Sequence, residues 1–284
     1  MKELFEFFAR HRSVRELVIS TLIGLGVYVA CALIIVAAER SQRRDLRIYR
    51  TRNALNDLGY AVFYKCSIYN VLVFPLFALL SPRLKFLQMT PMARLPPAVA
   101  FIACWIIFDF LNYWMHRLQH GVPALWAFHS VHHTQTQLTF LSANRIHAVE
   151  QLYVGVLMMI PALLLGIPQP RWLPLLLAQT FSETMQHARL NWTFGPLRWL
   201  IVSPAFHAVH HSTDDREYNA NYARVLSVWD VVFGTSVFSK EKERRYGVDG
   251  MDVPETLTAQ FAHPFRYLAR VGAGSQPAHT QRAG

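Results

Sequence analysis

The sequence predicts an all-α integral-membrane protein, a helical bundle with a histidine-rich helical cap on the cytoplasmic side. Three observations predict this class: the composition, long apolar segments, and histidines that cluster after the third of these segments. Of the 284 residues, 52% are hydrophobic and only 16% are charged. Soluble domains are roughly 25% charged, so this balance is typical of a chain that places much of its surface in lipid.

The net charge of +10 comes largely from arginines placed beside apolar segments. The densest group follows the first apolar run and consists of Arg40, Arg43, Arg44, Arg47, Arg50 and Arg52. Arginines in such positions contact anionic headgroups and mark the cytoplasmic flank of a membrane helix. The basic residues do not follow polar faces with interleaved aromatics, so no nucleic-acid partner is expected.

The first apolar run covers residues 17–38 without interruption and ends at Glu39. It is long enough to cross about 30 Å of hydrocarbon at about 1.5 Å per residue. A cleaved signal peptide is the alternative interpretation. Its apolar core is shorter than this run, and a strongly basic flank retains a segment on the inside. We therefore expect a retained membrane helix.

Further apolar segments predict more membrane helices. Residues 59–80 form a second candidate, which Pro75 is expected to kink. Residues 97–115 form a third, with prolines at its start, where proline costs least. Residues 148–181 are interrupted by Gly and Pro at 166–170, which predicts a helical hairpin dipping into the bilayer.

Orientation and domain organisation follow from these segments. The arginine loop predicts that the side reached after the first span is cytoplasmic. The second and third spans return the chain to that side near His116, so we expect the histidine-rich region to be cytoplasmic. The expected organisation has an N-terminal transmembrane region of two helices (1–96), a histidine-rich domain with the membrane hairpin (97–265), and a disordered tail (266–284).

Ten of the thirteen histidines fall between His116 and His211, and their spacing is informative. One H-x₃-H pair and two H-x₂-H-H triplets contain His116, His120, His129, His132, His133, His207, His210 and His211. On a helix, offsets of three and four place side chains on one face. Eight clustered imidazoles would repel one another if protonated, so they predict a bound metal.

Two isolated histidines stand at the ends of the predicted hairpin. His147 opens it and His187 closes it, so both return to the membrane face where His116 emerges. Each is a candidate ligand. A mononuclear zinc site takes about four ligands, so eight to ten imidazoles suggest two ions. Imidazole suits zinc, copper, iron and nickel alike, so the ligand type leaves the metal open.

Three carboxylates are spaced to hydrogen-bond ligand rings. Asp109 lies two helical turns before His116, Glu150 three residues after His147, and Glu183 four residues before His187. A carboxylate that accepts a ring N–H fixes the tautomer of a metal-bound histidine. For Asp109, a helix–helix hydrogen bond is an equal alternative.

The chain resembles the sterol desaturase / fatty acid hydroxylase superfamily over roughly residues 50–265. The resemblance is carried by the segments DFLNYWMHRLQH, WAFHSVHH, RIHAVE, MQHARLNW, SPAFHAVHH and NYARVLSVWDVVFGT. It implies a fatty acid hydroxylase-type di-iron domain over 97–265, with the eight clustered histidines as ligands. His187 matches a family histidine in a Gln-His context. His147 matches one that proline commonly follows, and Ala148 departs from that pattern.

The same resemblance implies the reaction: O₂-dependent hydroxylation or desaturation of a lipid. It implies two non-heme iron ions and an external electron donor, a ferredoxin or a cytochrome b5-type protein. Two alternatives remain at this point. One is a membrane zinc hydrolase that uses part of the histidine cluster. The other is a metal-binding or transport protein, which the gathering of histidines at one membrane face disfavours.

Overall fold

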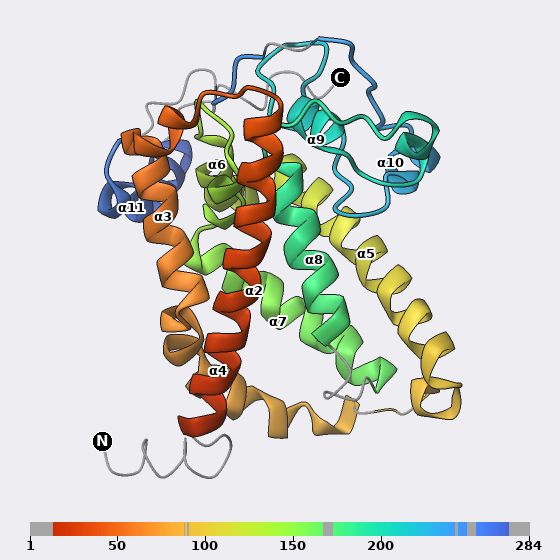
Figure 1. The fold of residues 1–284 in the computed structure, drawn as a ribbon. Coiled ribbons are helices and arrows are strands. Elements are labelled where there is room, and N and C mark those ends of the chain that lie inside the picture. Colours follow the sequence, from red (N-terminus) through yellow and green to blue (C-terminus); the bar gives the residue numbers. More distant parts are fainter. Residues whose placement is uncertain are drawn as a thin grey trace.

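The computed structural model describes residues 14–87, 89, 91–166, 173–241, 244–248 and 254–272. Within these ranges the chain is helical and contains no strand, as the sequence predicted. Long helices run side by side, and the shorter helices α9 and α10 gather with most of the loops at the end opposite the start of α2 (Figure 1). The all-α class expected from the sequence is confirmed for these residues.

Among the described residues, three helices are long and apolar enough to cross a membrane: α2 (Val14–Ser41), α5 (Pro97–Gly121) and α7 (Ala148–Leu165). A fourth crossing is available if α3 (Arg52–Lys65) and α4 (Ile68–Arg83), bent by 43° at their junction, act together. These helices include the apolar segments predicted from the sequence. They make the chain an integral-membrane protein.

The second span has a break that the sequence did not indicate. The chain breaks at Cys66 and Ser67, and α4 contains Pro75 within its length. Ser67 adopts a left-handed conformation, with φ of 60°, which no helix can propagate. A hydrogen bond joins its hydroxyl to that of Thr21 on α2 (Oγ to Oγ1, 2.6 Å). This tertiary contact holds the break, and local composition does not reveal it.

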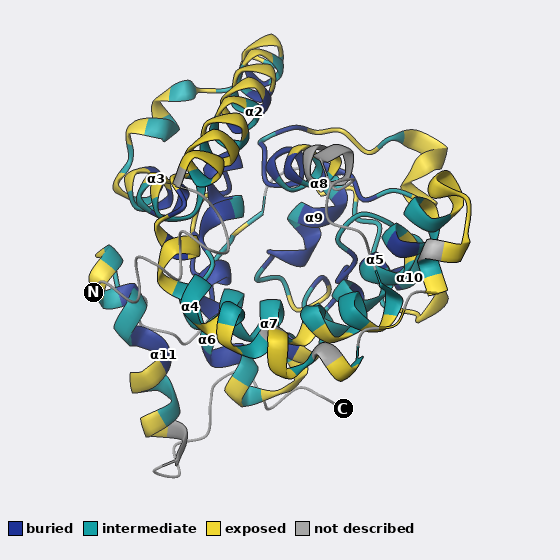
Figure 2. Ribbon diagram, turned by 90° about the horizontal axis from the view of Figure 1, so that it is seen from below, coloured by how far each residue is buried: buried dark blue, intermediate teal, exposed yellow. Residues whose placement is uncertain are grey.

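The outer faces of the membrane helices expose large apolar side chains. Along α2, Leu22, Leu33 and Ile34 are each more than half exposed. The same holds for Leu72 on α4 and for Ile102 on α5. Figure 2 shows exposed residues along the outward faces of these helices. Contiguous exposed apolar surface on this scale indicates contact with lipid.

The predicted hairpin is present as α7 and α8 (Leu173–Gln186). Helix α7 ends at Gly166, which has a positive φ of 64° and donates to the carbonyls of Ala162 and Leu163. A glycine in this conformation is the common way for a helix to stop. Residues 167–172 lie outside the described part of the chain.

Short helices build the cap beyond the membrane segments. They are α6 (Pro123–His133), α9 (Pro204–His210), α10 (Val228–Val232) and α11 (Leu257–Gly272). Short 3-10 turns connect the elements: η1 (Leu46–Arg50), η2 (Lys85–Leu87), η3 (Pro91–Arg94), η4 (Phe140–Asn144) and η6 (Gly195–Trp199).

Helix α11 corrects the predicted start of the C-terminal tail. The tail was expected from residue 266, but α11 continues to Gly272. Its apolar residues Leu257, Phe261 and Phe265 recur every four positions, and the helix packs against α6. The tail prediction for residues 273–284 falls outside the described residues.

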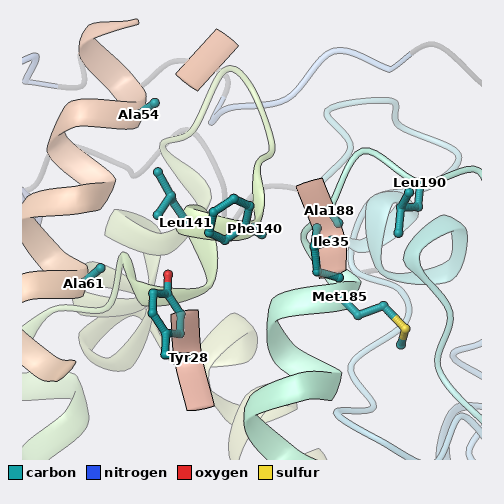
Figure 3. Close-up of a cluster of buried hydrophobic side chains, with 9 residues drawn as sticks. All are labelled: Tyr28, Ile35, Ala54, Ala61, Phe140, Leu141, Met185, Ala188 and Leu190. Carbon is teal, nitrogen blue, oxygen red and sulfur yellow. The ribbon is translucent and has the colours of Figure 1, made fainter. Parts of the chain in front are cut away.

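The N-terminal helices share a core with the cap. Tyr28 and Ile35 of α2 and Ala54 of α3 pack with Phe140 and Met185 in one buried cluster (Figure 3). The division expected at residue 96 stays a prediction. The shared core means that the first two helices support the elements that carry the histidines.

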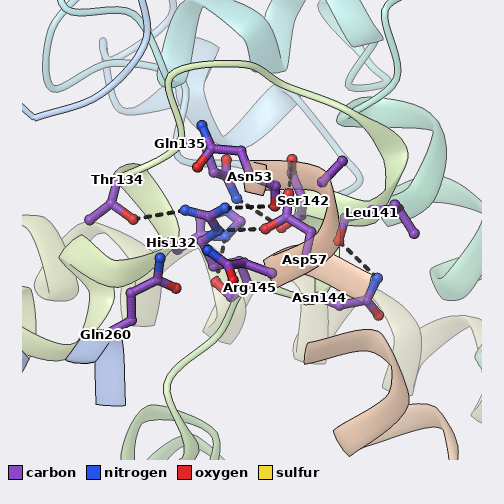
Figure 4. A network of polar contacts seen from close by, with 12 residues as sticks. Asn53, Asp57, His132, Thr134, Gln135, Leu141, Ser142, Asn144, Arg145 and Gln260 are labelled. Carbon is purple, nitrogen blue, oxygen red and sulfur yellow. Dashed lines mark hydrogen bonds and ion pairs between the residues drawn. The ribbon is translucent and has the colours of Figure 1, made fainter. Parts of the chain in front are cut away.

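A buried ion pair ties α3 to the loop after α6. The guanidinium Nε of Arg145 donates to Asp57 Oδ1 at 2.5 Å, and both side chains are 1% exposed. Asp57 Oδ2 also accepts from Ser142 Oγ, and Arg145 Nη1 donates to Thr134 Oγ1 (Figure 4). The backbone carbonyl of Arg145 faces His132. This network positions a histidine from outside its own helix.

Replacing Asp57 with alanine should lower the free energy of unfolding by about 3–5 kcal/mol, because it leaves the Arg145 charge buried and unpaired. Unfolding in mixed detergent micelles measures this change. The matched control is Glu255→Ala, which removes the partner of Arg52 in a pair whose side chains are 65% and 77% exposed. That variant should lose less than about 1 kcal/mol, and equal losses would contradict a supporting role for the buried pair.

Candidate metal centre

Nine histidines from four helices and their flanking residues converge in the cap. They form two groups, and within each group one ring nitrogen per residue lies within 4.8 Å of all the others. The first group contains His116, His120, His129, His133 and His210. The second group contains His132, His187, His207 and His211. Seven of the nine are buried, and His116 and His120 are half-buried.

Helices α6 and α9 each supply histidines to both groups. On α6, His129 and His133 are four residues apart and join the first group, whereas His132 joins the second. After the start of α9, His207 and His211 are four apart and join the second group, whereas His210 joins the first. An offset of four keeps two rings on one side of a helix. The H-x₂-H-H pattern therefore places the two groups side by side.

Backbone carbonyls and one carboxylate hold five of the rings in a single tautomer. Their Nδ1 atoms contact Tyr222 O (His116, 2.7 Å), Glu150 Oε1 (His129, 2.7 Å), Arg145 O (His132, 3.1 Å), Glu183 O (His187, 2.9 Å) and Ala220 O (His210, 2.8 Å). These oxygens only accept hydrogen bonds, so each Nδ1 must carry the hydrogen. In a neutral ring, Nε2 is then left with a bare lone pair.

Bare lone pairs face one another across each group. The Nε2 atoms of His132 and His187 are 3.2 Å apart, and those of His116 and His129 are 3.1 Å apart. Burial lowers the pKa of His132 well below its usual range and lowers the pKa of His187 to about 4. Neither ring of that pair is therefore protonated near neutral pH. Two facing lone pairs at this distance repel unless a cation lies between them.

A metal ion fits this arrangement. With metal–nitrogen bonds of about 2.1 Å, adjacent ligands at a right angle lie about 3 Å apart. The Nε2 atoms of His207 and His187, and those of His211 and His207, are each 3.1 Å apart. Several buried ring nitrogens have no hydrogen-bond partner: both of His120, Nε2 of His133, Nε2 of His210 and Nδ1 of His207. The donor set suits ions that prefer imidazole.

The structure does not bring His147 to either group. Its Nδ1 accepts a hydrogen bond from the backbone N–H of Val149 at 3.2 Å, which caps α7. Its Nε2 donates to the carbonyl of Phe261 at 3.0 Å, which fastens α11. Both ring nitrogens are thus engaged by backbone. His187, the other isolated histidine, lies in the second group.

Glu150 contacts a histidine other than its neighbour in sequence. Its Oε1 accepts from His129 on α6 and from Gln119 Nε2 on α5, at 2.7 and 2.9 Å. The carboxylate is 5% exposed, and its Oε2 has no hydrogen-bond partner. A carboxylate bonded to the far nitrogen of a ligand ring fixes its orientation and raises its basicity.

Asp109 and Glu183 do not bond a ligand ring through their carboxylates. Asp109 accepts from the backbone N–H groups of Val225 and Leu226 and from Trp229 Nε1. Its bond to Trp229 joins α5 to α10, so the helix–helix hydrogen bond considered for Asp109 is the one present. The Glu183 carboxylate pairs with Arg224, and only its backbone carbonyl reaches His187.

Sequence reasoning missed the backbone carbonyls that orient the rings. Asn219 and Asn221 have positive φ values of 54° and 60°. These conformations turn the chain so that the carbonyls of Ala220 and Tyr222 meet His210 and His116. Asparagine adopts this conformation more easily than other non-glycine residues. Two asparagines at alternate positions after an H-x₂-H-H triplet are the signal available in the sequence.

A cavity of about 120 Å³ adjoins both groups. Its walls include Asn112, Met115 and Gln119 of α5, Gln151 and Val154 of α7, and Glu183 and Gln186 of α8. Histidines of both groups line it, namely His116 and His129 of the first and His132, His187 and His207 of the second. A molecule in this cavity would therefore touch both groups while lying among the membrane helices.

Comparison with known proteins finds a family match in the middle of the chain. Residues 101–235 match the fatty acid hydroxylase family. The chain is 32% identical to the ornithine lipid hydroxylase OlsE of Rhizobium tropici over 176 residues, which is 62% of this chain and 53% of that protein. It is 33% identical to the alkylglycerol monooxygenase of Homo sapiens over 55% of this chain and 35% of that enzyme.

A further relative covers more of the chain. A cholesterol 25-hydroxylase-like protein of Danio rerio is 25% identical over 76% of this chain and 90% of its own length. No solved structure matches. The chain spans about half the length of the ornithine lipid hydroxylase, at 53%, and about a third of the alkylglycerol monooxygenase, at 35%. Over residues 101–235 the chain is thus similar to the fatty acid hydroxylase family, and these relatives are named as hydroxylases and a monooxygenase.

Proposed function

We propose that this chain is a membrane-bound, O₂-dependent lipid hydroxylase or desaturase with one iron ion in each histidine group. One observation carries the proposal: two adjoining sets of imidazole nitrogens converge beside a cavity among membrane helices. The proposed ligands are the nine histidines of the two groups. The geometry of His147 favours a structural role instead.

The donor set favours iron over the zinc alternative. A structural or catalytic zinc ion takes about four ligands, whereas the first group alone offers five imidazoles. The relatives are named hydroxylases and monooxygenases, which does not favour a hydrolase or a transporter. Iron, when bound, would supply the O₂ activation that oxidation of an unactivated C–H bond requires.

The residues of the chain orient the proposed ligands and form the walls of the cavity. The Nδ1 hydrogen bonds fix the orientation of five rings and aim Nε2 at each proposed ion. Because α5, α7 and α8 supply walls of the cavity, we propose that a lipid enters it from the bilayer between these helices. The residues that line this cavity would set which carbon of the substrate lies nearest the ions.

The names of the relatives narrow the class of substrate. They act on, or are named for, an ornithine lipid, an alkylglycerol and cholesterol. We propose that the substrate is likewise a lipid whose reacting carbon enters the cavity from the bilayer. The names favour hydroxylation over desaturation as the outcome. Both outcomes begin with removal of hydrogen from carbon, and they differ in the step that follows.

We also propose that the metal centre faces the cytoplasm. The arginine-rich loop that follows α2 lies at the same end of the molecule as the histidines. The backbone N–H of Arg189, two residues after His187, donates to Glu39, and its Nη1 donates to the carbonyl of Asp45. Arginines flanking membrane helices mark the cytoplasmic side. An external ferredoxin or cytochrome b5-type protein would deliver electrons there.

Replacing His133 with alanine should lower bound iron from two ions per chain to one or none, and His207→Ala should do the same from the other group. Iron analysis of purified protein measures this. His147→Ala and His263→Ala are the matched controls, because both histidines are buried outside the groups. Iron loss from either control equal to that from His133→Ala would contradict the proposed ligand set.

Glu150→Gln should weaken iron binding by about tenfold to a hundredfold, because the charge that supports His129 is lost. The rate at which a chelator removes iron measures this. The control is Asp109→Asn, which alters a carboxylate bonded to backbone and Trp229. That variant should lose thermal stability while retaining iron. Equal rates of iron loss from both variants would rule out a positioning role specific to Glu150.

Replacing His132 or His210 with alanine should abolish product formation while the protein still inserts into the membrane. Lipid profiling of cells with and without the chain, under ¹⁸O₂, identifies the product. Hydroxylation predicts a lipid heavier by one labelled oxygen atom, and desaturation predicts one lighter by two hydrogen atoms. Full activity in either variant would remove that residue from the machinery, and an unchanged lipid profile would reject the function.

A further inference from the structure

A second and larger cavity lies on the cap, apart from the cavity beside the two histidine groups. This groove has a volume of about 780 Å³. Helix α9 and the loops that follow α2, α6 and α8 form its walls, together with a later stretch that includes residues 238–241 and 244. It shares no lining residue with the smaller cavity. A partner in this groove would therefore not compete with a lipid beside the metal groups.

The groove is strongly basic. Its walls carry Arg44, Arg189, Arg198 and Lys240, against the single carboxylate of Glu241. Arg244 also lines it but is neutralised by Glu217, with Nε donating to Oε2 at 2.8 Å. Within the described part of the chain, the first four cations form no ion pair with a carboxylate. Their field is available to a negatively charged partner.

Two of these arginines line the groove with hydrogen-bond donors or charge that no carboxylate of the described residues pairs. The Nε of Arg44 is buried and has no hydrogen-bond partner. Arg198 is exposed, and its guanidinium lies over the rings of Trp199 and Phe238 at 5.5 and 5.1 Å. Stacking on aromatic rings holds an arginine in place while leaving its N–H donors free. Arg198 is therefore arranged to meet anionic groups, and Arg44 adds a positive charge to the wall of the groove.

The floor of the groove lies directly behind the second histidine group. Ala188, next to His187 in the chain, and Ala208, next to His207, both line the groove. Ala205, two residues before His207 on α9, lines it as well. One residue of backbone thus separates the groove from two proposed ligands. Electron transfer rates fall steeply with distance, so a redox centre docked here has a short path to the metal site.

We propose that this groove docks an acidic, soluble one-electron carrier protein that reduces the metal centre. The inference rests on the proposed function. Hydroxylation converts one C–H bond and one O₂ into C–OH and water, and it consumes two electrons and two protons. The carrier, an iron–sulfur or haem protein, would deliver the two electrons one at a time, and the protons come from water. Complementary charge favours an acidic partner and speeds its association.

The test measures carrier binding directly, with the full chain in nanodiscs of neutral phosphatidylcholine. The probes are a soluble plant-type [2Fe–2S] ferredoxin and the soluble haem domain of a cytochrome b5, each at low and high ionic strength. The groove variant is Arg44→Glu with Arg198→Glu. The matched control is Arg43→Glu with Arg50→Glu, which reverses two exposed arginines of the same loop region that do not line the groove.

The groove variant should weaken binding of the preferred probe by at least about tenfold at low ionic strength, and the control by less than about threefold. Turnover driven by dithionite should be equal in all three proteins. Three results would overturn the proposal: equal weakening by both variants, no weakening by either, or no binding of either probe to the wild type.

Two further measurements complete the test. The first distinguishes a lipid-headgroup site from a carrier site, and the second distinguishes failure of the docking proposal from failure of the proposed function. If anionic phosphatidylglycerol in the nanodisc weakens carrier binding by the wild type to the level of the groove variant, the groove binds headgroups and the proposal is wrong. If the wild type lacks dithionite-driven turnover, the proposed function fails. The binding measurements would still decide whether the groove recognises an acidic carrier.

Discussion

The arrangement depends on one electrostatic constraint: buried, neutral imidazoles whose lone pairs face one another about 3 Å apart, as in the 3.2 Å contact of His132 with His187. Carbonyl and carboxylate acceptors fix Nδ1 as the protonated nitrogen in five rings. The remaining Nε2 lone pairs repel one another until a cation lies among them. The surrounding packing holds the rings close together despite this repulsion, so the site is arranged to bind a metal ion before the ion arrives.

That packing comes from well outside the histidine motifs. The pair of Asp57 and Arg145 joins α3 to the loop whose carbonyl orients His132. Asp109 on α5 holds the backbone of Val225 and Leu226, close to the carbonyl that meets His116. Membrane helices and cap thus form one scaffold. The lipid-facing surface, the cavity and the metal groups are positioned by the same contacts.

Much of this organisation follows from local patterns in the sequence. Long apolar runs predicted the membrane helices, because the thickness of the bilayer dictates their length. The offsets of three and four predicted convergent rings, because helical geometry is regular. The placement of His187 with the clustered histidines followed from its position at the end of a hairpin.

The remaining features depend on tertiary contacts that a local pattern does not contain. Glu150 was paired with His147 by spacing, but it bonds His129 from another helix. The second span also bends at Ser67, which a contact with Thr21 holds, and no local pattern indicated this bend. The carbonyls that fix the tautomers belong to backbone, which carries no signature in side-chain spacing. The division of the histidines between two groups likewise required the folded structure.

The most direct test of the central claim is anomalous diffraction at the iron edge from crystals of the wild-type protein. The account predicts two iron peaks, one within each histidine group, at about 2 Å from the surrounding ring nitrogens. A single peak, zinc in place of iron, or metal bound away from the two groups would contradict it.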